Sequence, residues 1–484
     1  MNQQNVIFHF ISQAAQNPEA IALQKGNEKV SYTALQKKCD ELQYSFQLQG
    51  LKAGHKILIL HPVGINLYAA MLALLRMGCT LVFAEEWNGL RDIAACERHM
   101  KCDAMLCSYK IRLITILFSS LRNLKRIVLQ PKSLNSNVLI ATHKPAENLA
   151  ALVSFSSGSS GIPKAVIRTH AQLNAQFMAL KPHVKLNAGG RICTNFPVVI
   201  LLNLGLGLHT YISTALQLSA LEKTDFGAFN AEINDHQIAC LACSPFVIDT
   251  LATYLQHRQQ KLLTVQQILT GGSPFFPAFA DHIYKMFPNA AVKVLYGSSE
   301  AEPIAFCEAQ EVIKNKEKPG LFSGKTDQHT DCKIGEFQNG VFSECQTNIP
   351  GEILVSGAHV VTDYYESPEA FADHKLQLDG KVWHRTGDYG YFDEMNQLFL
   401  TGNPSYSNGL EHLLDAEKKL ADIPGVVRAT LLKHEVFIHK QDFADEKTIE
   451  KHVRALFTEV QKVKFMKLPL DKRHHGKIKY GQLI

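Results

Sequence analysis

The hydrophobic and polar residues of the first 300 positions alternate between two spacings, one typical of β-strands and one typical of α-helices. Residues 56–60 and 80–84 form apolar runs, which predict buried strands. Between them, residues 65–77 place apolar side chains at helical spacing and lead into Gly78, which favours a helix C-terminus. Residues 30–33 predict a short strand before a helix. This alternation predicts an α/β fold with mostly parallel sheets covered by helices.

The pattern changes in the later part of the chain, where strand-like runs stand between turn residues. Residues 333–342 and 351–356 predict such strands, and we expect a β-rich subdomain over about 330–401. A run of Asn, Pro, Ser and Gly residues then follows Gly402, before a mixed helix and strand pattern begins.

We expect a domain boundary at this loop. Residues 1–401 would form a large multi-layer α/β domain, and residues 402–484 a small C-terminal α+β lid domain. The length of 484 residues and the hydrophobic content of 46% agree with several folded units that bury large cores.

Charge and hydropathy exclude several classes of protein. A formal net charge of +5 is far below that of a typical nucleic-acid binder, so we expect no nucleic acid as a partner. The longest apolar stretch, residues 196–208, is too short to span a bilayer and is broken by Pro197 and Asn203. The N-terminus lacks the basic segment of a signal peptide. We therefore expect a soluble, cytoplasmic protein without integral membrane association.

Eleven cysteines are scattered along the chain without the spacing of a disulfide framework. The closest pair, Cys240 and Cys243, lies in an apolar, strand-like run. A zinc site would need a second pair of Cys or His residues, and none stands out nearby in the sequence. Buried free thiols in a reduced protein are the preferred interpretation.

The strongest chemical signal is a Gly- and Ser-rich run at residues 154–164, which ends at Lys164. Glycines let a backbone approach phosphate oxygens, hydroxyl and N–H groups donate hydrogen bonds, and a lysine adds positive charge. A flexible linker is the alternative, but strand-like segments flank the run on both sides. A Walker A loop is excluded, because Pro163 replaces its second glycine and Ala165 replaces the Ser or Thr that holds magnesium.

This run resembles the phosphate loop of the adenylate-forming (AMP-binding) superfamily. That family contains acyl-CoA synthetases, fatty acyl-AMP ligases, nonribosomal-peptide adenylation domains and firefly-type luciferases. Other segments resemble further motifs of the same family and follow one another in the family's order: residues 30–35, 50–54, 74–78, 296–300, 386–388 and 476–478. The resemblance implies an enzyme that uses ATP and Mg²⁺, and it covers nearly the whole chain.

The resemblance assigns nucleotide binding to two sets of residues. The phosphate loop would contribute small residues and one lysine: Ser156, Ser157, Gly158, Ser159, Ser160, Gly161 and Lys164. In the second set, Tyr296 would stack on adenine and Asp388 would accept hydrogen bonds from the ribose hydroxyls. The members of that set are Gly271, Gly272, Ser273, Tyr296, Gly297, Ser298 and Asp388.

The resemblance also implies three catalytic residues. Glu300 would hold Mg²⁺, Ser299 would contact the α-phosphate, and Lys477 would bridge the carboxylate and phosphate oxygens in the transition state. Plainer interpretations exist. Glu300 could be a solvated acid and Asp388 a turn former, while Lys477 stands among other Lys, Arg and His residues that form a basic tail.

Two positions depart from the family pattern. Where the family has Gly-Arg, a charged hinge residue and a later lysine, this chain has Asn403 and uncharged residues through Gly409. In the family this segment lets the C-terminal domain rotate between two half-reactions, so the departure leaves the hinge mechanism and thioester formation with coenzyme A open. At Ile200, where many relatives have a histidine, an apolar residue suits an acyl pocket.

The sequence therefore leaves three alternative functions open. The leading one is an acid–thiol ligase, which converts a fatty or other apolar carboxylic acid to acyl-AMP and pyrophosphate. It would then transfer the acyl group to the thiol of coenzyme A, a candidate co-substrate, or of an acyl or peptidyl carrier protein. The third is a non-catalytic relative that binds nucleotide or acyl groups.

The second function is a β-lactone synthetase, in which the hydroxyl of a β-hydroxy acid displaces AMP from its own acyl-AMP. It is prompted by short segments that resemble olefin β-lactone synthetases, at residues 84–89, 299–304 and 471–478. We expect the segments at residues 195–207, 270–273 and 296–304 to line the pocket for the acid.

Overall fold

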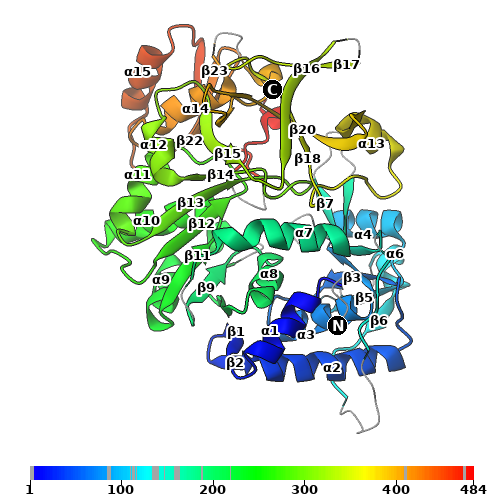
Figure 1. Ribbon diagram of the computed structural model, residues 1–484. Helices are drawn as coiled ribbons and strands as arrows, with labels where there is room; N and C mark the ends of the chain where they lie inside the picture. Colours follow the sequence, from blue (N-terminus) through cyan, green and yellow to red (C-terminus); the bar gives the residue numbers. More distant parts are fainter. Residues whose placement is uncertain are drawn as a thin grey trace. The chain divides into compact units, whose positions relative to one another are not determined.

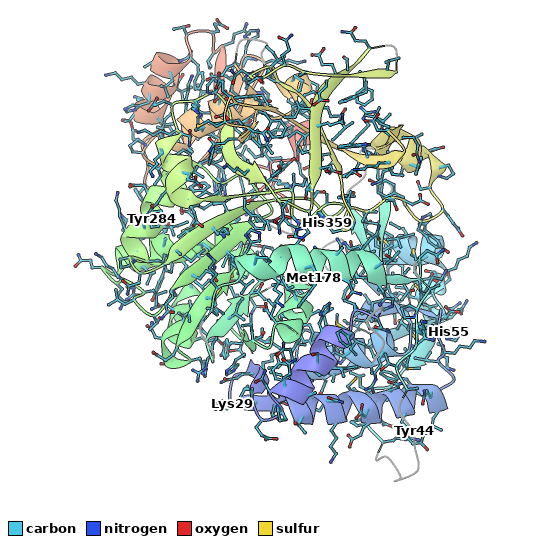
Figure 2. The ribbon with its side chains drawn as sticks, in the orientation of Figure 1. Lys29, Tyr44, His55, Met178, Tyr284 and His359 are labelled. Carbon is cyan, nitrogen blue, oxygen red and sulfur yellow. The ribbon has the colours of Figure 1, made fainter. Side chains whose placement is uncertain are left out.

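Figure 1 shows the computed structural model, coloured along the sequence. The chain divides into two compact units. Unit 1 comprises Met1–Ala242, Ser299–Glu302 and Ala358–Lys375, and unit 2 comprises Cys243–Ser298, Pro303–Gly357 and Leu376–Ile484. The structure describes residues 5–83, 89–108, 111, 115, 117–132, 141–146, 148–156, 164–186, 189–217, 220–338, 340–407, 411–471 and 476–483. In each unit, side chains fill the space between sheets and helices (Figure 2).

The first sheet of unit 1 has six strands, of which the first five run parallel and the last is antiparallel. In spatial order they are β6 (Lys125–Ile127), β5 (Ala104–Cys107), β3 (Lys56–Leu60), β4 (Thr80–Phe83), β7 (Ala150–Ser156) and β8 (Lys164–Thr169). Successive residues of β3 enter different cores, because side chains of a strand alternate between its faces. Ile57 and Ile59 pack with α2 (Tyr32–Leu48) and α3 (Ile65–Arg76). Leu58 and Leu60 pack with α4 (Gly89–Met100) and α6 (Ser119–Arg122).

Unit 1 contains a second group of strands. In spatial order they are β2 (Glu28–Ser31), β1 (Ile21–Lys25), β10 (His209–Ile212), β9 (Arg191–Thr194) and β11 (Ile238–Ala242). A small cavity described below lies near the ends of two of them, β9 and β10. All pairs are parallel except β1 with β2. The remaining helices of this unit are α1 (Phe8–Gln16), α7 (His170–Leu180), η2 (Lys181–His183), α8 (Val199–Gly205), η3 (Leu221–Lys223), α9 (Phe226–Asp235) and α13 (Pro368–His374).

Unit 2 begins with two parallel strands and continues as an antiparallel sheet. In spatial order the strands are β12 (Gln267–Gly271), β13 (Ala291–Tyr296), β14 (Ala305–Glu308), β15 (Leu321–Thr326), β21 (Leu398–Leu400), β20 (Lys381–Phe392), β18 (Gly351–Ser356), β16 (Asp331–Gln338) and β17 (Val341–Glu344). The accompanying helices are α10 (Pro245–His257), α11 (Pro277–Met286) and α12 (Ala309–Lys314). The short strand β19 (Lys375–Leu378) begins at the last residue of unit 1 and continues in unit 2.

The last part of unit 2 is a small α+β arrangement with its own three-stranded sheet. It contains η4 (Pro404–Tyr406), α14 (Leu413–Ala421), β22 (Val426–Leu432), β23 (Glu435–Lys440), α15 (Glu446–Leu456), β24 (Lys462–Phe465) and η5 (Tyr480–Gln482). Strand β23 pairs antiparallel with β22 and parallel with β24, and α14 and α15 supply apolar side chains to the core beneath. This agrees with the mixed pattern in the sequence.

The predicted α/β class and most predicted elements are confirmed, with two corrections. Residues 333–342 form two strands, β16 and β17, because Gln338 pairs with Val341 across a tight reversal in which Gly340 has φ +80°. The strand expected at 30–33 ends at Ser31, whose hydroxyl accepts the Ala34 N–H and so starts α2.

All eleven cysteines are free thiols, as the sequence predicted, and Cys240 and Cys243 are buried. Within the described ranges, no helix combines the length and the apolar character that crossing a membrane requires. The domain boundary at residue 402 stays a prediction.

Candidate functional site

The predicted phosphate loop connects the two strands of a hairpin. Strand β7 ends at Ser156 and β8 begins at Lys164, and these two residues pair with each other in the antiparallel register. The predicted residues Ser157, Gly158, Ser159, Ser160 and Gly161 lie outside the described residues, as does the side chain of Ser156. The structure therefore fixes where the loop leaves and rejoins the sheet.

Lys164, at the start of β8, lies against the segment that precedes and includes α13. Its Nζ contacts Nε2 of His374. The next residue of β8 is held as well, because the Tyr365 N–H donates to the Ala165 carbonyl at 3.1 Å. Burial lowers the pKa of His374, and the charge of Lys164 lowers it further, so the ring is neutral near pH 7 and can accept from the ammonium.

Ser299 and Glu300 are held in unit 1 by contacts to their main chain. Arg168 of β8 donates from Nε and Nη2 to the Ser299 carbonyl at 3.2 and 2.7 Å. The Val361 N–H donates to the Glu300 carbonyl at 2.8 Å, and the Tyr364 hydroxyl lies 3.4 Å from Glu300 Oε1. The predicted metal ligand Glu300 is thus placed beside the strand that begins at Lys164.

A buried lysine that the sequence analysis missed stands in the same group. Lys375 donates from Nζ to the Val361 carbonyl, and its ammonium lies 5.0 Å from the centre of the Tyr364 ring. Burial lowers the pKa of Lys375 to about 8, although the charges of Glu300 and Asp363 oppose the shift. Lys375 lies outside every recognised motif, so only its placement relates it to Glu300.

This group suits a magnesium–phosphate complex. Mg²⁺ keeps several waters and is usually bound by one or two carboxylates together with substrate phosphates. Glu300 offers one carboxylate, while Lys164 supplies positive charge in the same unit. In the part of the chain that the structure describes, no three His, Cys, Asp or Glu side chains gather into a metal-binding group. The residues present fit a magnesium ion that takes most of its ligands from ATP and water.

In unit 2 the structure brings together two predicted adenosine-binding residues. The Tyr296 hydroxyl donates to Asp388 Oδ2 at 2.9 Å. Burial and the Asp388 charge raise the pKa of Tyr296 well above its usual value, so the phenol keeps its proton. Asp388 is exposed, and its N–H donates to Thr386 Oγ1 at 3.0 Å, which fixes the backbone before the carboxylate. The second carboxylate oxygen is on an exposed side chain and can accept from a ligand.

The glycine segment predicted as the other wall follows strand β12, which ends at Gly271. A Cβ on Gly271 would lie 2.4 Å from the Leu295 carbonyl oxygen, so glycine permits the close pairing of β12 with β13. Thr270 Oγ1 and Ser273 Oγ are shielded from solvent without a hydrogen-bond partner among the described residues. Hydroxyls of this kind fit a polar ligand at the carboxyl ends of parallel strands.

The loop that carries Gly297 and Ser298 leaves the same end of β13. It closes with the Ile304 N–H donating to the Tyr296 carbonyl at 2.9 Å. Along this loop the chain passes from unit 2, at Ser298, to unit 1, at Ser299.

Lys477 lies on a short hairpin in unit 2. Asp471 Oδ1 accepts from the N–H groups of Gly476 and Lys477 at 3.1 and 2.8 Å, and the Asp471 N–H donates to the Lys477 carbonyl at 2.8 Å. Leu470 and Ile478 form an antiparallel bridge. The Lys477 side chain is exposed on a fixed backbone. Its catalytic role stays a prediction.

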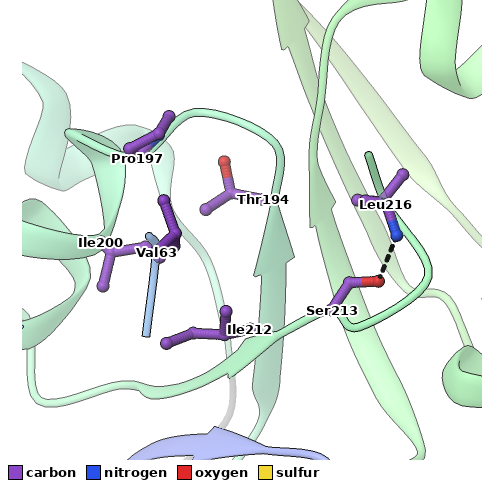
Figure 3. A pocket seen from close by; sticks show the side chains of 7 residues that line it. All are labelled: Val63, Thr194, Pro197, Ile200, Ile212, Ser213 and Leu216. Atoms are coloured by element: carbon purple, nitrogen blue, oxygen red, sulfur yellow. Dashed lines mark hydrogen bonds between the residues drawn. The ribbon is translucent and has the colours of Figure 1, made fainter. Parts of the chain in front are cut away.

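A small cavity in unit 1 includes part of the predicted acid-binding segment (Figure 3). Its volume of about 10 Å³ has room for roughly one water molecule. Pro197 and Ile200 come from the predicted segment, and the other lining residues are Val63, Thr194, Ile212, Ser213 and Leu216. The Leu216 N–H donates to Ser213 Oγ at 3.0 Å. The sequence analysis missed the residues after β10, although neighbouring parallel strands end at one edge of a sheet.

The fold and these residues define the adenylate-forming class of proteins. The chain belongs to the AMP-binding enzyme family, whose model matches residues 10–365. The predicted family and fold class are therefore confirmed.

Individual relatives are distant. The chain is similar to 4-coumarate–CoA ligase 1 of Oryza sativa subsp. japonica, with 26% identity over 251 residues, covering 51% of this chain and 43% of the relative. It is also similar to the olefin beta-lactone synthetase of Stenotrophomonas maltophilia (strain K279a), with 26% identity over 306 residues, covering 59% of this chain and 54% of the relative. The chain thus spans about half the length of the curated relatives it matches.

A solved structure matches nearly the whole fold. O-succinylbenzoate coenzyme A synthetase (MenE) of Bacillus subtilis, in complex with ATP and magnesium ion, has a TM-score of 0.81 to this chain. The match covers 98% of each chain at 17% sequence identity, which supports a common fold.

Proposed function

We propose that this protein is a ligase that uses ATP and Mg²⁺ to activate a carboxylic acid as an acyl-AMP, with release of pyrophosphate. The observation that carries the proposal is the pair of hydrogen bonds from Arg168 to the Ser299 carbonyl. They tie the candidate metal ligand Glu300 to strand β8, which begins at the candidate phosphate ligand Lys164. Two family motifs that are far apart in the sequence therefore meet in one unit.

The proposed reaction is an in-line displacement at the α-phosphorus. A carboxylate oxygen of the acid forms a bond to that phosphorus, and the bond from phosphorus to the oxygen of the pyrophosphate group breaks. All reacting groups are anionic, so neutralising charge and alignment contribute most to the rate. Bound Mg²⁺ would supply part of that charge at Glu300. Tyr296 and Asp388 would hold adenosine, Ser299 would contact the α-phosphate, and Lys477 would neutralise charge in the transition state.

We further propose that the acyl group is then transferred to a thiol, of coenzyme A or of a carrier protein. The similarity to a 4-coumarate–CoA ligase supports this acceptor. We propose a fatty or other apolar acid, because the segment around Ile200 is apolar and Ile200 itself is buried. A cytoplasmic location fits the eleven free thiols. A role in lipid metabolism would follow if the acid is a fatty acid.

A second candidate is β-lactone formation, in which the hydroxyl of a β-hydroxy acid attacks its own acyl-AMP and expels AMP. It is favoured by the similarity to an olefin beta-lactone synthetase and by the sequence around Asn403. Asn403 Oδ1 accepts from the N–H and the hydroxyl of Ser405 at 3.0 and 2.7 Å, and Pro404 follows it directly. This capped turn replaces the family's charged hinge.

The test is a panel of carboxylic acids, including β-hydroxy acids, scored by pyrophosphate release. Each acid is measured with and without coenzyme A. We expect pyrophosphate and AMP with at least one apolar acid. Products of ADP and phosphate would contradict the proposal, because they indicate attack at the γ-phosphate. No turnover with any acid, together with tight ATP binding, would favour the non-catalytic relative instead. A thioester or a β-lactone among the products decides the acceptor.

A further inference from the structure

The hairpin that carries Lys477 is attached to helix α14 by a partly buried hydrogen bond. The Tyr480 hydroxyl donates to Glu417 Oε1 at 2.8 Å, and only 4% of Glu417 is exposed. Burial raises the pKa of Tyr480 well above its usual value, and the charges of Glu417 and Asp388 raise it further.

Apolar contacts reinforce the same attachment. Leu413 of α14, Leu468 and Ile478 of the hairpin, and Leu432 and Phe437 of the small sheet form one buried cluster. The rings of Tyr406 and Tyr480 lie 5.1 Å apart, next to this cluster. Because interiors are close-packed, the hairpin can shift only if α14 shifts with it.

Helix α14 is in turn anchored to residues 318–320 by two side chains that form a buried ion pair within the helix, Asp415 in its first turn and Lys418 in its last. Lys418 Nζ lies 3.0 Å from Asp415 Oδ1, and both residues are only 7% exposed. The ammonium also donates to the carbonyls of Lys318 and Gly320 at 2.7 and 2.8 Å. Asp415 Oδ1 accepts from the Gly320 N–H at 2.7 Å. An ammonium has three protons, and three oxygens are here arranged around it.

Residues 318–320, which α14 contacts through Lys418 and Asp415, are themselves fixed to the large sheet of unit 2. The Tyr391 hydroxyl of β20 donates to the Pro319 carbonyl at 2.6 Å, and Lys318 Nζ lies 3.0 Å from Asp393 Oδ2. The Leu414 N–H adds a hydrogen bond to the Thr401 carbonyl at 3.1 Å. An unbroken series of contacts therefore leads from β20 through α14 to the Lys477 hairpin.

We propose that α14 holds the Lys477 hairpin, before ATP binds, in the position from which Lys477 acts in adenylation. Lys418 and Asp415 are the positioning residues. The proposal rests on the proposed adenylation, in which Lys477 acts on the reacting oxygens. Lys418 acts only through the position of the hairpin. An ion pair of exposed residues would contribute little to such an anchor. Removing one member of a buried pair is strongly unfavourable, because it leaves an uncompensated charge.

The test compares Lys418→Met with Lys419→Met in the full chain. Lys419 is the next residue, but it is exposed and pairs with Glu411, so it offers the same substitution outside the anchor. Amide hydrogen exchange is measured without ATP in peptides that cover residues 318–321 and 413–421. The adenylation rate is measured by pyrophosphate exchange at varied ATP concentrations.

We expect faster exchange in both peptides of Lys418→Met, and an adenylation kcat about 10- to 100-fold lower, since small misplacements of a catalytic group have effects of this size. The KM for ATP should stay near that of the parent, because the adenosine ligands are untouched. Lys418→Arg, which keeps the charge and the donors, should recover most of the rate. Lys419→Met should match the parent in every measurement.

Each of the other outcomes would contradict a different part of the proposal. Parent-like exchange in a folded Lys418→Met means that the pair is no anchor, and faster exchange with a parent-like rate means that the anchor does not position Lys477. If Lys418→Met fails to fold, the double variant Asp415→Asn, Lys418→Met leaves no unpaired buried charge and is judged by the same criteria. If the parent adenylates no acid, the proposed function fails together with the positioning role, whereas the exchange data still decide the anchor.

Discussion

At the scale of single residues, the hydrogen bond between Tyr296 and Asp388 joins side chains that are 92 positions apart. It uses Oδ2 of the carboxylate, and the carboxylate is otherwise exposed. A ribose presents two neighbouring hydroxyls, and an ionised carboxylate can accept from both. The pair thus orients a ligand-binding group without using all of its acceptor capacity.

Asp388→Ala should weaken ATP binding while the fold stays intact, because the side chain is exposed. A hydrogen bond to a charged acceptor contributes roughly 1.5–3 kcal/mol, so ATP affinity should fall by about 10- to 150-fold. Calorimetric titration measures the change. Tyr296→Phe, which keeps both the ring and the carboxylate, shows how much of it comes from losing the hydrogen bond that orients Asp388. Asp388 is not the ribose acceptor if its removal leaves ATP affinity within about twofold of the parent.

Much of the candidate site could be predicted from short motifs, because loops that approach phosphate need particular residue types at fixed spacing. The groups that hold these motifs could not be predicted. Arg168 acts on a carbonyl oxygen of Ser299, and any residue type has a carbonyl there. Lys375 is a lysine in an unremarkable polar stretch, and only the fold buries it beside Tyr364. Such contacts depend on long-range packing, which local patterns do not record.

At the scale of elements, prediction succeeded where burial on both faces left a continuous apolar run. Strand β3 is the example, since Ile57 and Leu58 enter two different cores. The prediction of one strand over residues 333–342 is wrong, because the chain there forms the two paired strands β16 and β17. The sequence held a signal for the reversal, because Asn-Gly between strands is the strongest short hairpin motif. Apolar and polar residues are interspersed on both sides of the Asn-Gly pair, and this pattern favours one continuous strand over a hairpin.

Strand β15 contains a glycine that the sheet requires. Gly324 has φ +84°, and a Cβ there would lie 2.0 Å from the Phe306 carbonyl oxygen of the neighbouring strand β14. Gly324→Ala should therefore combine backbone strain with overpacking and lower the free energy of unfolding by more than about 2 kcal/mol.

Gly340→Ala is the control for this substitution. Gly340 has a similar φ of +80°, but a Cβ there would meet nothing within 4 Å. This variant should lose only the conformational part, about 1–2 kcal/mol. Urea unfolding measures both variants, and equal losses would show that the contact with Phe306 can relax.

At the scale of the whole molecule, the sequence pattern and the compact units divide the chain differently. The pattern changes at Gly402, and the boundary predicted there stays a prediction. The structure groups the residues after 402 with those of β12 to β18 in unit 2. The buried contacts of Lys418 with residues 318–320 are among those that join these parts of unit 2. Hydrogen bonds from a lysine to backbone carbonyls 98 and 100 positions away leave no mark on local hydrophobic periodicity, so the sequence could not reveal them.

The final prediction separates catalysis from binding through Lys477. Its side chain is exposed on a backbone that Asp471 holds, so Lys477→Ala should leave the fold unchanged. An ammonium between two anionic reactants acts most in the transition state, where the forming bond draws their charges together. By comparison with the loss of one oxyanion donor, Lys477→Ala should slow adenylation roughly 10²- to 10³-fold. ATP affinity should change little, because Lys164, Tyr296 and Asp388 remain.

Single-turnover adenylation and ATP titration together measure this separation, since a group used only in the transition state lowers the rate without weakening ground-state binding. Lys479→Ala is the control, because Lys479 is an exposed lysine of the same hairpin. Supplied with preformed acyl-AMP, Lys477→Ala should still complete acyl transfer, whichever acceptor is used. If Lys477 is merely part of a solvated basic tail, the Lys477 and Lys479 variants will both adenylate like the parent. That result would remove Lys477 from the site, whereas a slow Lys477→Ala beside a fast Lys479→Ala assigns the effect to one ammonium.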